Sequence, residues 1–430
     1  MTKHQIQMTN RGHDVVRSGR SVARITARAV RAACVAGVGI VATFAVCLAS
    51  AADWPAFRGA DGTSVARDAA LPLTWNEKEN IAWKADLPGR GPSGPIVVGG
   101  RVFVTASDGV RQDRLYVLCF DAQSGEELWR RTFWATGRTL THPFSANAAP
   151  TPVSDGRYVY AFFSSNDLAC LDLDGNLRWY RGLGHDYPKA GNDVGMSCSP
   201  VLADDTIVVQ VESQSDPFAA GIDATTGEER WRIRRDAAAN WASPTVMRTG
   251  GETVVLLQSP SGLTAHDVSS GKKLWRHDAR CGDIASPVFR DGRVFIPSDG
   301  LTVLAPPTEG TAATLLWNSP RMRPGPASAV VDEDRVYALY SGVLSCAKVE
   351  DGDLLWQLRV GGTHWTTPVI ADGHLYCIDQ EGNATVIRLG EKGEIVGTSQ
   401  FGEPVLGSPA VSGNALFVRG AKHLWKIAAP

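Results

Sequence analysis

Residues that could bind or transform a ligand are concentrated in two long polar segments of this sequence. The first segment spans residues 133–149, and the second spans residues 182–197. Both combine imidazole, amide and aromatic side chains, and the second also contains carboxylates. Their candidate site residues are His142, Asn147, His185, Asp186, Asn192 and Asp193. Shorter polar segments further along the chain add Trp241, Asp283, Arg321, His364 and Trp365 as ligand-binding candidates.

Two interpretations of these residues are open. If these residues gather on one rim of the fold, they could form a polar pocket for an anionic or sugar-like ligand. Alternatively, they satisfy the backbone of long loops and cover the core. The neighbours His185 and Asp186 could act as a base and its orienting acid only if both face a substrate, which adjacent loop residues seldom do.

Catalytic motifs are absent from the sequence. It contains no glycine-rich phosphate loop, no nucleophile elbow and no zinc-ligand spacing. We therefore expect no catalytic residue and no metal site. A hydrolase or lyase that acts on polysaccharide through His142, His185 and His364 is kept as an alternative.

A repeated phrase indicates the elements that must position these segments. It places an aspartate ahead of a glycine and a tryptophan, as in residues 121–129 and 223–231. Self-similarity of this kind, at roughly 40 to 50 residues, is typical of β-propellers built from four-stranded blades. The tryptophans of the repeat are Trp83, Trp129, Trp179, Trp231, Trp275, Trp317 and Trp356, with Val396 in a degenerate copy. We expect these rings to wedge between neighbouring blades, which is a structural role.

A second motif supplies an independent count of the blades. Each unit begins with a small residue, usually followed by proline and apolar residues, and the eight starts are Gly94-Pro95, Thr151-Pro152, Ser199-Pro200, Ser243-Pro244, Ser286-Pro287, Ser328-Ala329, Thr367-Pro368 and Ser408-Pro409. The unit that begins at Ser408 is one strand short, whereas residues 81–84 resemble a closing strand without a start. The sequence therefore predicts an all-β, eight-bladed propeller of four-stranded antiparallel blades over residues 81–430. Its ring is closed by an N-terminal strand, which removes an open sheet edge, and no helix is expected in it.

The N-terminal region differs in composition from the rest of the chain. A basic stretch, an apolar run over residues 32–49 and small residues up to Ala52 describe a secretory signal peptide over residues 1–52. An uncleaved membrane anchor is the alternative, because the run approaches the ~20 residues that a spanning helix needs. Residues 53–80 then form a leader to the propeller. We expect an exported protein, periplasmic or extracellular, that contacts a membrane only through this N-terminal segment.

Charge and cysteine content narrow the function classes further. The formal net charge is −2 and the pI is about 6.5, which gives no electrostatic footprint for nucleic acid. Six cysteines follow the apolar run, at Cys119, Cys170, Cys198, Cys281, Cys346 and Cys377, and none forms a Cys-x-x-Cys pair. We expect these cysteines to be buried free thiols. A single bridge between Cys119 and Cys170, which occupy equivalent places in successive units, stays open.

The phrase at residues 121–129 and 223–231 resembles the tryptophan-docking repeat of the PQQ-like (pyrroloquinoline quinone) repeat propeller superfamily. The resemblance extends over residues 81–427, and the leader from Asp53 to Gly59 resembles the opening of secreted bacterial members. The superfamily has two branches. One contains quinoprotein alcohol dehydrogenases that hold PQQ and calcium in the central funnel, and the other contains non-catalytic propellers of the BamB type.

This sequence departs from the pattern of the dehydrogenase branch, and these departures favour the non-catalytic branch. The dehydrogenases generally carry adjacent bridged cysteines, longer loops and a set of calcium ligands, and none of these matches this sequence. We therefore expect a non-catalytic binding or scaffold module for a protein or polymer of the cell envelope, with no cofactor and as a monomer. A PQQ- and calcium-dependent alcohol dehydrogenase is the main alternative.

Overall fold

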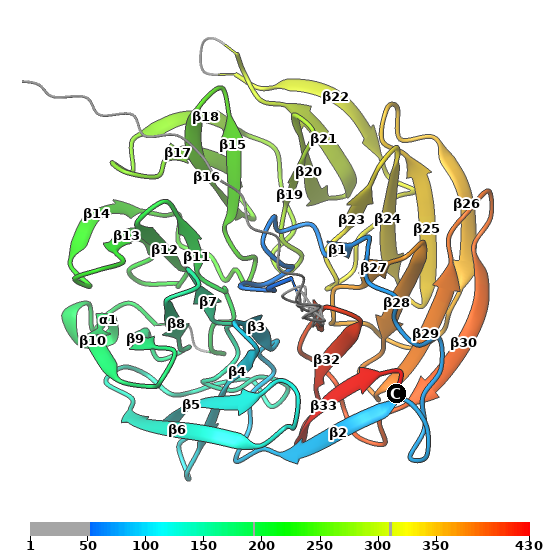
Figure 1. Ribbon diagram of the computed structural model, residues 1–430. Helices are drawn as coiled ribbons and strands as arrows, with labels where there is room; N and C mark the ends of the chain where they lie inside the picture. The colour runs from blue at the N-terminus through cyan, green and yellow to red at the C-terminus, as the bar shows by residue number, and fades with distance from the viewer. Residues whose placement is uncertain (1–51, 192–193, 309–311) are drawn as a thin grey trace, which may run out of the picture. The chain divides into compact units, whose positions relative to one another are not determined.

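The predicted ring of eight blades is present in the structure. This computed structural model describes residues 52–191, 194–308 and 312–430. They form eight sheets, one per predicted unit, arranged around a central axis (Figure 1). The signal peptide predicted for residues 1–52 lies outside the described residues except for Ala52. Within the described ranges, no helix has the length and apolar character needed to cross a membrane.

Each blade contains four antiparallel strands, which follow one another from the axis to the periphery. Blade 1 consists of β3 (Ile96–Val98), β4 (Arg101–Asp108), β5 (Arg114–Asp121) and β6 (Glu127–Trp134), and blade 2 of β7 (Val153–Ser154), β8 (Tyr158–Phe162), β9 (Asp167–Asp172) and β10 (Leu177–Gly182). Blade 3 consists of β11 (Val201–Ala203), β12 (Thr206–Val211), β13 (Phe218–Asp223) and β14 (Glu229–Arg234), and blade 4 of β15 (Thr245–Thr249), β16 (Glu252–Ser259), β17 (Gly262–Asp267) and β18 (Lys273–His277). The second and third strands are apolar on both faces because neighbouring blades cover them.

Blades 5 to 8 repeat this arrangement. Blade 5 consists of β19 (Val288–Arg290), β20 (Arg293–Ser298), β21 (Gly300–Ala305) and β22 (Thr314–Ser319), and blade 6 of β23 (Val330–Asp332), β24 (Arg335–Tyr340), β25 (Val343–Lys348) and β26 (Leu354–Arg359). Blade 7 contains β27 (Val369–Ala371), β28 (His374–Ile378), β29 (Asn383–Arg388) and β30 (Glu394–Gln400), and blade 8 contains β31 (Ala410–Ser412), β32 (Ala415–Arg419), β33 (His423–Ala428) and the N-terminal strand β2 (Ile81–Asp86).

The N-terminal strand closes the ring, as predicted. β2 pairs antiparallel with β33, with Lys84 opposite Trp425 and Asp86 opposite His423. Blade 8 therefore combines an N-terminal strand with three C-terminal strands, and β2 and β33 lie side by side in Figure 1. Closure of this kind completes blade 8 and covers the edge of β33, which would otherwise be unpaired.

Two details differ from the sequence expectation. Residues Leu183–Asp186 form a four-residue helix, α1, so the expectation of no helix in the propeller is wrong. The segment from blade 2 to blade 3 is long enough to hold one helical turn before it returns to the axis. In addition, β1 (Val65–Ala66) of the leader pairs in parallel with β27, so blade 7 has five strands instead of four.

The repeated tryptophans wedge between blades, as predicted. Six of the seven repeat tryptophans donate from the indole Nε1–H to a backbone carbonyl of the next blade. These bonds of 2.8–3.3 Å run from Trp83 to Ala122, Trp129 to Leu173, Trp179 to Ala224, Trp231 to Val268, Trp317 to Val349 and Trp356 to Gly390. The turn glycine of the next blade lies against the ring. At Gly271, which has φ +69°, an added Cβ would lie 2.6 Å from the Trp231 ring, so the glycine is required by both conformation and space.

The aspartate of the repeat and the cysteines both have structural roles. Asp121 accepts the backbone N–H groups of Gln123 and Ser124 at 2.9 and 2.7 Å, which lowers its pKa and forms the predicted turn. All six cysteines of the described residues are free and buried, so the alternative of a Cys119–Cys170 bridge is not met. Burial raises the pKa of the Cys119 and Cys170 thiols to about 12, which keeps both neutral.

We expect a buried histidine in blade 4 to make the stability of the propeller depend on pH. His266 hydrogen bonds through Nδ1 to the Gly271 carbonyl at 2.9 Å, its Nε2 has no partner, and burial lowers its pKa from 6.5 to about 4. The unfolded chain therefore binds a proton at this residue between pH 6.5 and 4, whereas the folded chain does not. We expect the free energy of unfolding to fall as the pH drops through this window, by on the order of 2–3 kcal/mol. Urea unfolding at pH 7 and pH 4.5 should show a smaller fall for His266→Gln, and equal falls would contradict the assignment.

Candidate functional site

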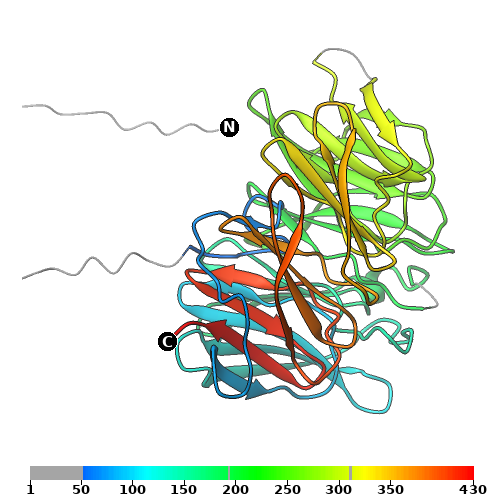
Figure 2. The same ribbon diagram turned by 90° about the vertical axis from the view of Figure 1, so that its right-hand side faces the viewer.

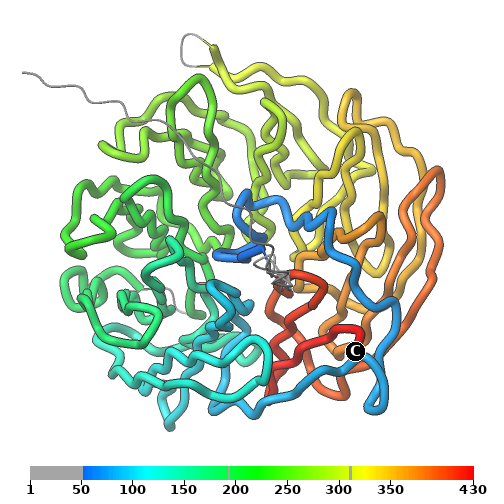
Figure 3. Tube along the Cα trace, viewed as in Figure 1, coloured from blue at the N-terminus to red at the C-terminus, as the bar shows by residue number. Residues whose placement is uncertain are grey.

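The leader crosses one end of the central channel. Its backbone and side chains contact blades on both sides of the axis, and these contacts include Trp54 with Val97, Pro55 with Ser154, Asp61 with Arg290, Ser64 with Ile370 and Ala70 with Asn414. The partners lie in or next to the first strands of blades 1, 2, 5, 7 and 8, toward the turn into the second strand. The leader (blue) lies on one side of the ring in Figure 2, and Figure 3 traces it from the axis to the periphery.

A buried arginine anchors the leader on the far side of the axis. The guanidinium of Arg58 donates from Nη1 to the Pro287 carbonyl at 2.9 Å and from Nη2 to Thr245 Oγ1 at 3.2 Å. Both partners lie more than 180 residues away in the sequence. Burial lowers the pKa of Arg58 to about 10, so the residue remains charged at neutral pH. The leader is therefore fixed across the ring as well as along its edge.

The residues that start the blades form a ring of hydroxyl groups around the axis. In each case the backbone N–H at one start donates to the side-chain hydroxyl at the next start, and seven such bonds of 2.9–3.3 Å link Gly94 to Thr151, Thr151 to Ser199, Ser199 to Ser243, Ser243 to Ser286, Ser286 to Ser328, Ser328 to Thr367 and Thr367 to Ser408. Serine and threonine recur at these starts because each hydroxyl satisfies a buried N–H of the preceding blade.

This hydroxyl ring is interrupted where the chain closes on itself. Gly94, at the start of blade 1, has no hydroxyl to accept from blade 8. A Cβ at this position would lie 2.5 Å from the Ser408 carbonyl oxygen, so a serine would collide with the backbone. At this level the junction between blades 8 and 1 therefore leaves no room for a side chain at position 94.

A central cavity of about 410 Å³ lies between the hydroxyl ring and the loops that connect successive blades. Phe57 of the leader lines it, together with seven blade-start hydroxyl residues. The remaining lining comes from the connecting loops and consists of Pro92, His142, Phe144, Ser145, Ala149, Val194, Ser197, Trp241, Ile284, Pro326, Trp365 and Leu406. No acid, lysine or arginine is among these described lining residues, and the cavity is therefore apolar with hydroxyl groups. We call the end of the ring that carries these loops the loop face.

Three residues that the sequence singled out line this cavity. His142 accepts the Phe144 backbone N–H at Nδ1, at 3.2 Å, and its ring packs on the Phe144 ring. Trp241 donates from Nε1 to the Gly195 carbonyl at 3.0 Å and from its backbone to Asp283 O at 2.6 Å, so it connects three loops. Trp365 donates to Gln380 Oε1 at 3.2 Å and is partly exposed.

The second long segment contributes less to the cavity than its composition indicated. His185 and Asp186 lie on α1, where Asp186 pairs with Arg181 at 2.7 Å and His185 is exposed. Their closest approach is 3.7 Å, and neither residue lines the cavity. Asn192 and Asp193 fall outside the described residues.

The other candidates have supporting positions. Asn147 is buried and donates from Nδ2 to the Gln112 carbonyl at 2.8 Å, which holds the first long loop. His364 is buried and is not among the lining residues, and burial lowers its pKa. Asp283 contributes its backbone carbonyl to Trp241, and its side chain, like that of Arg321, is exposed.

Sequence reasoning missed the residues that give the cavity its chemistry. Phe57 was assigned to a leader with no role in the site, and the serines and threonines served only to count blades. The sequence did contain a signal for the hydroxyl ring, because Ser or Thr recurs at the blade starts. Proline alone would have been enough to mark the start of a strand, so the recurring hydroxyl group needed a cause of its own. No local signal could have found Phe57, since its position depends on the path of the leader.

The comparisons with known proteins agree with this architecture. The sequence profile of the family described as "Outer membrane protein assembly factor BamB" matches residues 50–194, 113–318 and 299–396. The chain belongs to this family. Relatives include BamB of Burkholderia pseudomallei (strain K96243), 28% identical over 54% of this chain, and BamB of Yersinia pestis, 27% identical over 42% of it. The matched regions span 59% and 51% of the lengths of those relatives.

Solved structures share the fold at lower identity. BamB from Moraxella catarrhalis superposes with a TM-score of 0.58 at 16% identity, covering 80% of this chain and 96% of that one. A europium-containing methanol dehydrogenase gives 0.62 at 12% identity, covering 86% and 90% of the two chains. The quinohemoprotein alcohol dehydrogenase of Comamonas testosteroni gives 0.60 at 13% identity, covering 87% and 80%. Both branches of the superfamily therefore share this ring, and the fold alone does not choose between them.

Proposed function

We propose that this chain is an exported, non-catalytic propeller that binds a protein or polymer of the cell envelope through its loop face. The observation that carries the proposal is the lining of the central cavity, which is apolar with hydroxyl groups and has no acid, lysine or arginine among its described residues. The relatives named outer membrane protein assembly factor support the envelope assignment. Residues 1–52 would supply the export signal.

The chemistry of PQQ and calcium supports this choice over the dehydrogenase alternative. PQQ carries three carboxylates, and calcium requires six to eight oxygen ligands, several of them usually carboxylates. The described lining offers hydroxyl groups, aromatic rings and one imidazole. No group of three or more His, Cys, Asp or Glu side chains within the described residues could hold a metal ion. The described lining of the central cavity therefore does not fit the cofactor pair, and we assign no redox step to it.

Exposed apolar side chains support binding at the loop face. Phe144 has 63% of its surface exposed, and Val194 and Trp365 are also exposed beside the cavity mouth. Apolar residues gathered around a concave site commonly mark an interaction surface. The backbone around them is held by hydrogen bonds such as His142 N–H to Val194 O at 2.8 Å, so the rim is largely preformed for binding.

Site-specific crosslinking tests the proposal. A photoreactive phenylalanine analogue at position 144 is expected to form adducts with an envelope component in cells that export the full chain. The same analogue at Leu128, which is 45% exposed on the outer strand of blade 1, serves as the control. We expect adducts at position 144 to be several-fold more abundant, and protease digestion with mass spectrometry then separates protein from polymer.

Two results would contradict the proposal. Equal adduct yields at positions 144 and 128 would remove the loop face as the binding surface. A melting temperature raised by PQQ with calcium, together with dye-linked alcohol oxidation, would restore the dehydrogenase alternative, because a ligand at 100 times its Kd stabilises the folded state by about 2.7 kcal/mol.

A further inference from the structure

A second cavity of about 370 Å³ lies beside the central one on the loop face. We call it the side cavity. The two share the lining residues Pro92, Phe144, Ser145 and Leu406, so they adjoin each other. Unlike the central cavity, the side cavity has a buried cation in its lining, Arg419 at the end of β32.

Arg419 differs from the other buried arginines in its bonding. Three arginines are buried within the described residues: Arg58, Arg235 and Arg419. Both Nη atoms of Arg58 donate to oxygen atoms, and Arg235 pairs with Glu212 at 3.1 Å while its remaining nitrogens donate to Thr264 and Leu257. Arg419 is the most deeply buried of the three.

Only one nitrogen of Arg419 is used within the protein. Its Nη1 donates to Thr105 O at 2.7 Å and to Ser93 Oγ at 3.0 Å, whereas Nη2 and Nε have no partner. No carboxylate lies within ion-pairing distance of it among the described residues, since none of the ion pairs there includes Arg419. Burial lowers the pKa of Arg419 to about 9, so the guanidinium remains charged at neutral pH.

The acids near Arg419 are engaged elsewhere. Glu403 accepts the Lys422 backbone N–H at 2.7 Å, the Trp425 indole N–H at 2.7 Å and His423 at 3.0 Å. Glu381, the one acid in the lining of the side cavity, is exposed and accepts from Gln380 Nε2 at 3.1 Å. A buried cation without a partner is costly, and an arriving oxyanion would offset that cost through charge-assisted hydrogen bonds.

We propose that the side cavity receives the carboxylate of an acidic residue of a polypeptide partner, while the apolar residue next to it enters the central cavity. This inference rests on the proposed function and deepens it by naming the chemistry of the ligand. A polypeptide suits the pair of cavities because it supplies a carboxylate and an apolar side chain on neighbouring residues. Pro92 and Phe144, which line both cavities, favour the apolar part, and the charged guanidinium of Arg419, whose Nε and Nη2 have no partner in the protein, favours the anion.

The test compares two blocked dipeptides of equal size. The acetyl-phenylalanyl-aspartic acid amide carries the ring and the carboxylate, and the acetyl-phenylalanyl-asparagine amide carries the ring and a neutral amide. Ligand-observed saturation-transfer NMR with the full exported chain measures each Kd. We expect the aspartyl peptide to bind about tenfold more tightly, because hydrogen bonds between charged partners are about twice as strong as neutral ones. Equal affinities, or no binding of either peptide, would overturn the proposal.

Variants separate the two parts of the site. Arg419→Met keeps the length of the apolar stem and should abolish the difference between the peptides, provided that circular dichroism shows a folded chain. Phe144→Ala changes an exposed side chain, so folding is not at risk, and it should weaken both peptides by about the same factor, severalfold. Leu128→Ala, on the outer strand of blade 1, should change neither Kd. Equal loss of both peptides in Arg419→Met would assign Arg419 a structural role instead.

A sugar acid decides the class of partner. Glucuronic acid carries a carboxylate without an aromatic or aliphatic side chain, and we expect it to bind at least about tenfold more weakly than the aspartyl peptide. Comparable binding would overturn the polypeptide assignment and favour an acidic polysaccharide. Crosslinking at position 144 does not depend on these probes. Adducts there without peptide discrimination would reject this inference and leave the proposed function standing.

Discussion

Deletion of residues 53–84 is expected to abolish the cooperative unfolding of the propeller. Blade 8 would lose its outer strand, β2, and the central channel would lose the leader that crosses it. The buried surfaces of Leu424 and Ile427 would then face water. Because a folded domain is stable by only about 5–15 kcal/mol, the loss of a closing strand and a buried plug is sufficient to remove that margin. Thermal melting followed by far-ultraviolet circular dichroism would measure it.

A shorter deletion separates the closing strand from the plug. Removing residues 53–58 takes away Phe57 and Arg58 but leaves β1 and β2 in place. This variant should still unfold cooperatively, at a melting temperature between those of the intact chain and the longer deletion. Unchanged melting of the longer deletion would refute ring closure by β2, and unchanged melting of the shorter one would refute the anchoring role of Arg58.

Truncation of a wedged tryptophan is expected to destabilise the propeller far more than the loss of an exposed aromatic side chain. Trp231 is 7% exposed, donates to Val268 O at 2.9 Å and packs on the turn glycine of blade 4. Trp231→Ala removes both the packing and the bond, and leaves the carbonyl of the next blade without its donor. We expect the free energy of unfolding to fall by about 3–5 kcal/mol, measured by urea unfolding.

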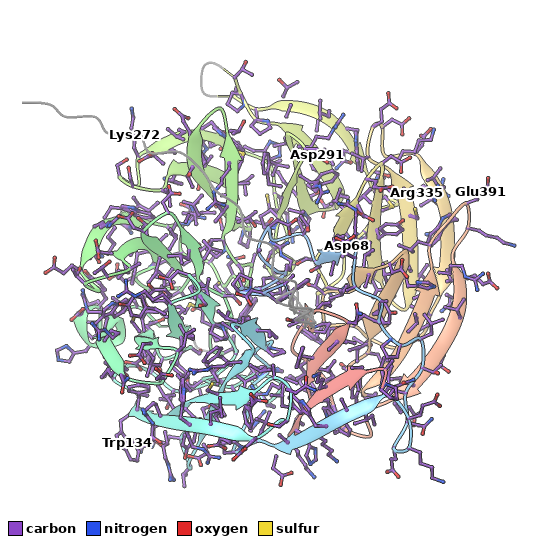
Figure 4. The ribbon with its side chains drawn as sticks, in the orientation of Figure 1. Asp68, Trp134, Lys272, Asp291, Arg335 and Glu391 are labelled. Atoms are coloured by element: carbon purple, nitrogen blue, oxygen red, sulfur yellow. The ribbon has the colours of Figure 1, made fainter. Side chains whose placement is uncertain are left out.

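Trp134 provides the matched control for that substitution. Its side chain is 64% exposed and lies at the periphery of the ring, at the end of β6 (Figure 4). Trp134→Ala removes the same side chain from a site without inter-blade packing, so the change should stay within about 0.5 kcal/mol. Equal losses at positions 231 and 134 would show that the wedge between blades is not what the repeated tryptophans contribute.

The blade count was accessible from sequence because its signals are local and repeated. Each blade carries a start motif and a tryptophan phrase, and both have the same physical cause in every copy. The start hydroxyl caps an N–H of the preceding blade, as in Thr151 to Ser199, and the indole ring packs on the next turn. Even ring closure by residues 81–84 followed from counting, because the unit that begins at Ser408 is one strand short and residues 81–84 form a strand that belongs to no other unit.

The site was less accessible, because its residues have no common local pattern. His142, Trp241 and Trp365 were identified as rim candidates from residue type, and they do line the cavity. His185 and Asp186 had the more suggestive chemistry, yet the turn of α1 directs them to an ion pair with Arg181 and to solvent. Loop residues diverge in this way because their direction depends on the backbone path, which residue type alone does not define.

By itself the sequence determined the fold class, the number of blades, the way in which the ring closes and the structural role of the tryptophans. These properties follow from hydrophobic patterning and turn chemistry within single units. Only the tertiary structure decided that the leader crosses the channel, that the blade starts form a hydroxyl ring, and that Arg419 lies buried with Nη2 unpartnered in the lining of the side cavity. Each of these joins residues from different blades or from the leader, and contacts across a ring arise from its closure and leave no periodic trace along the chain.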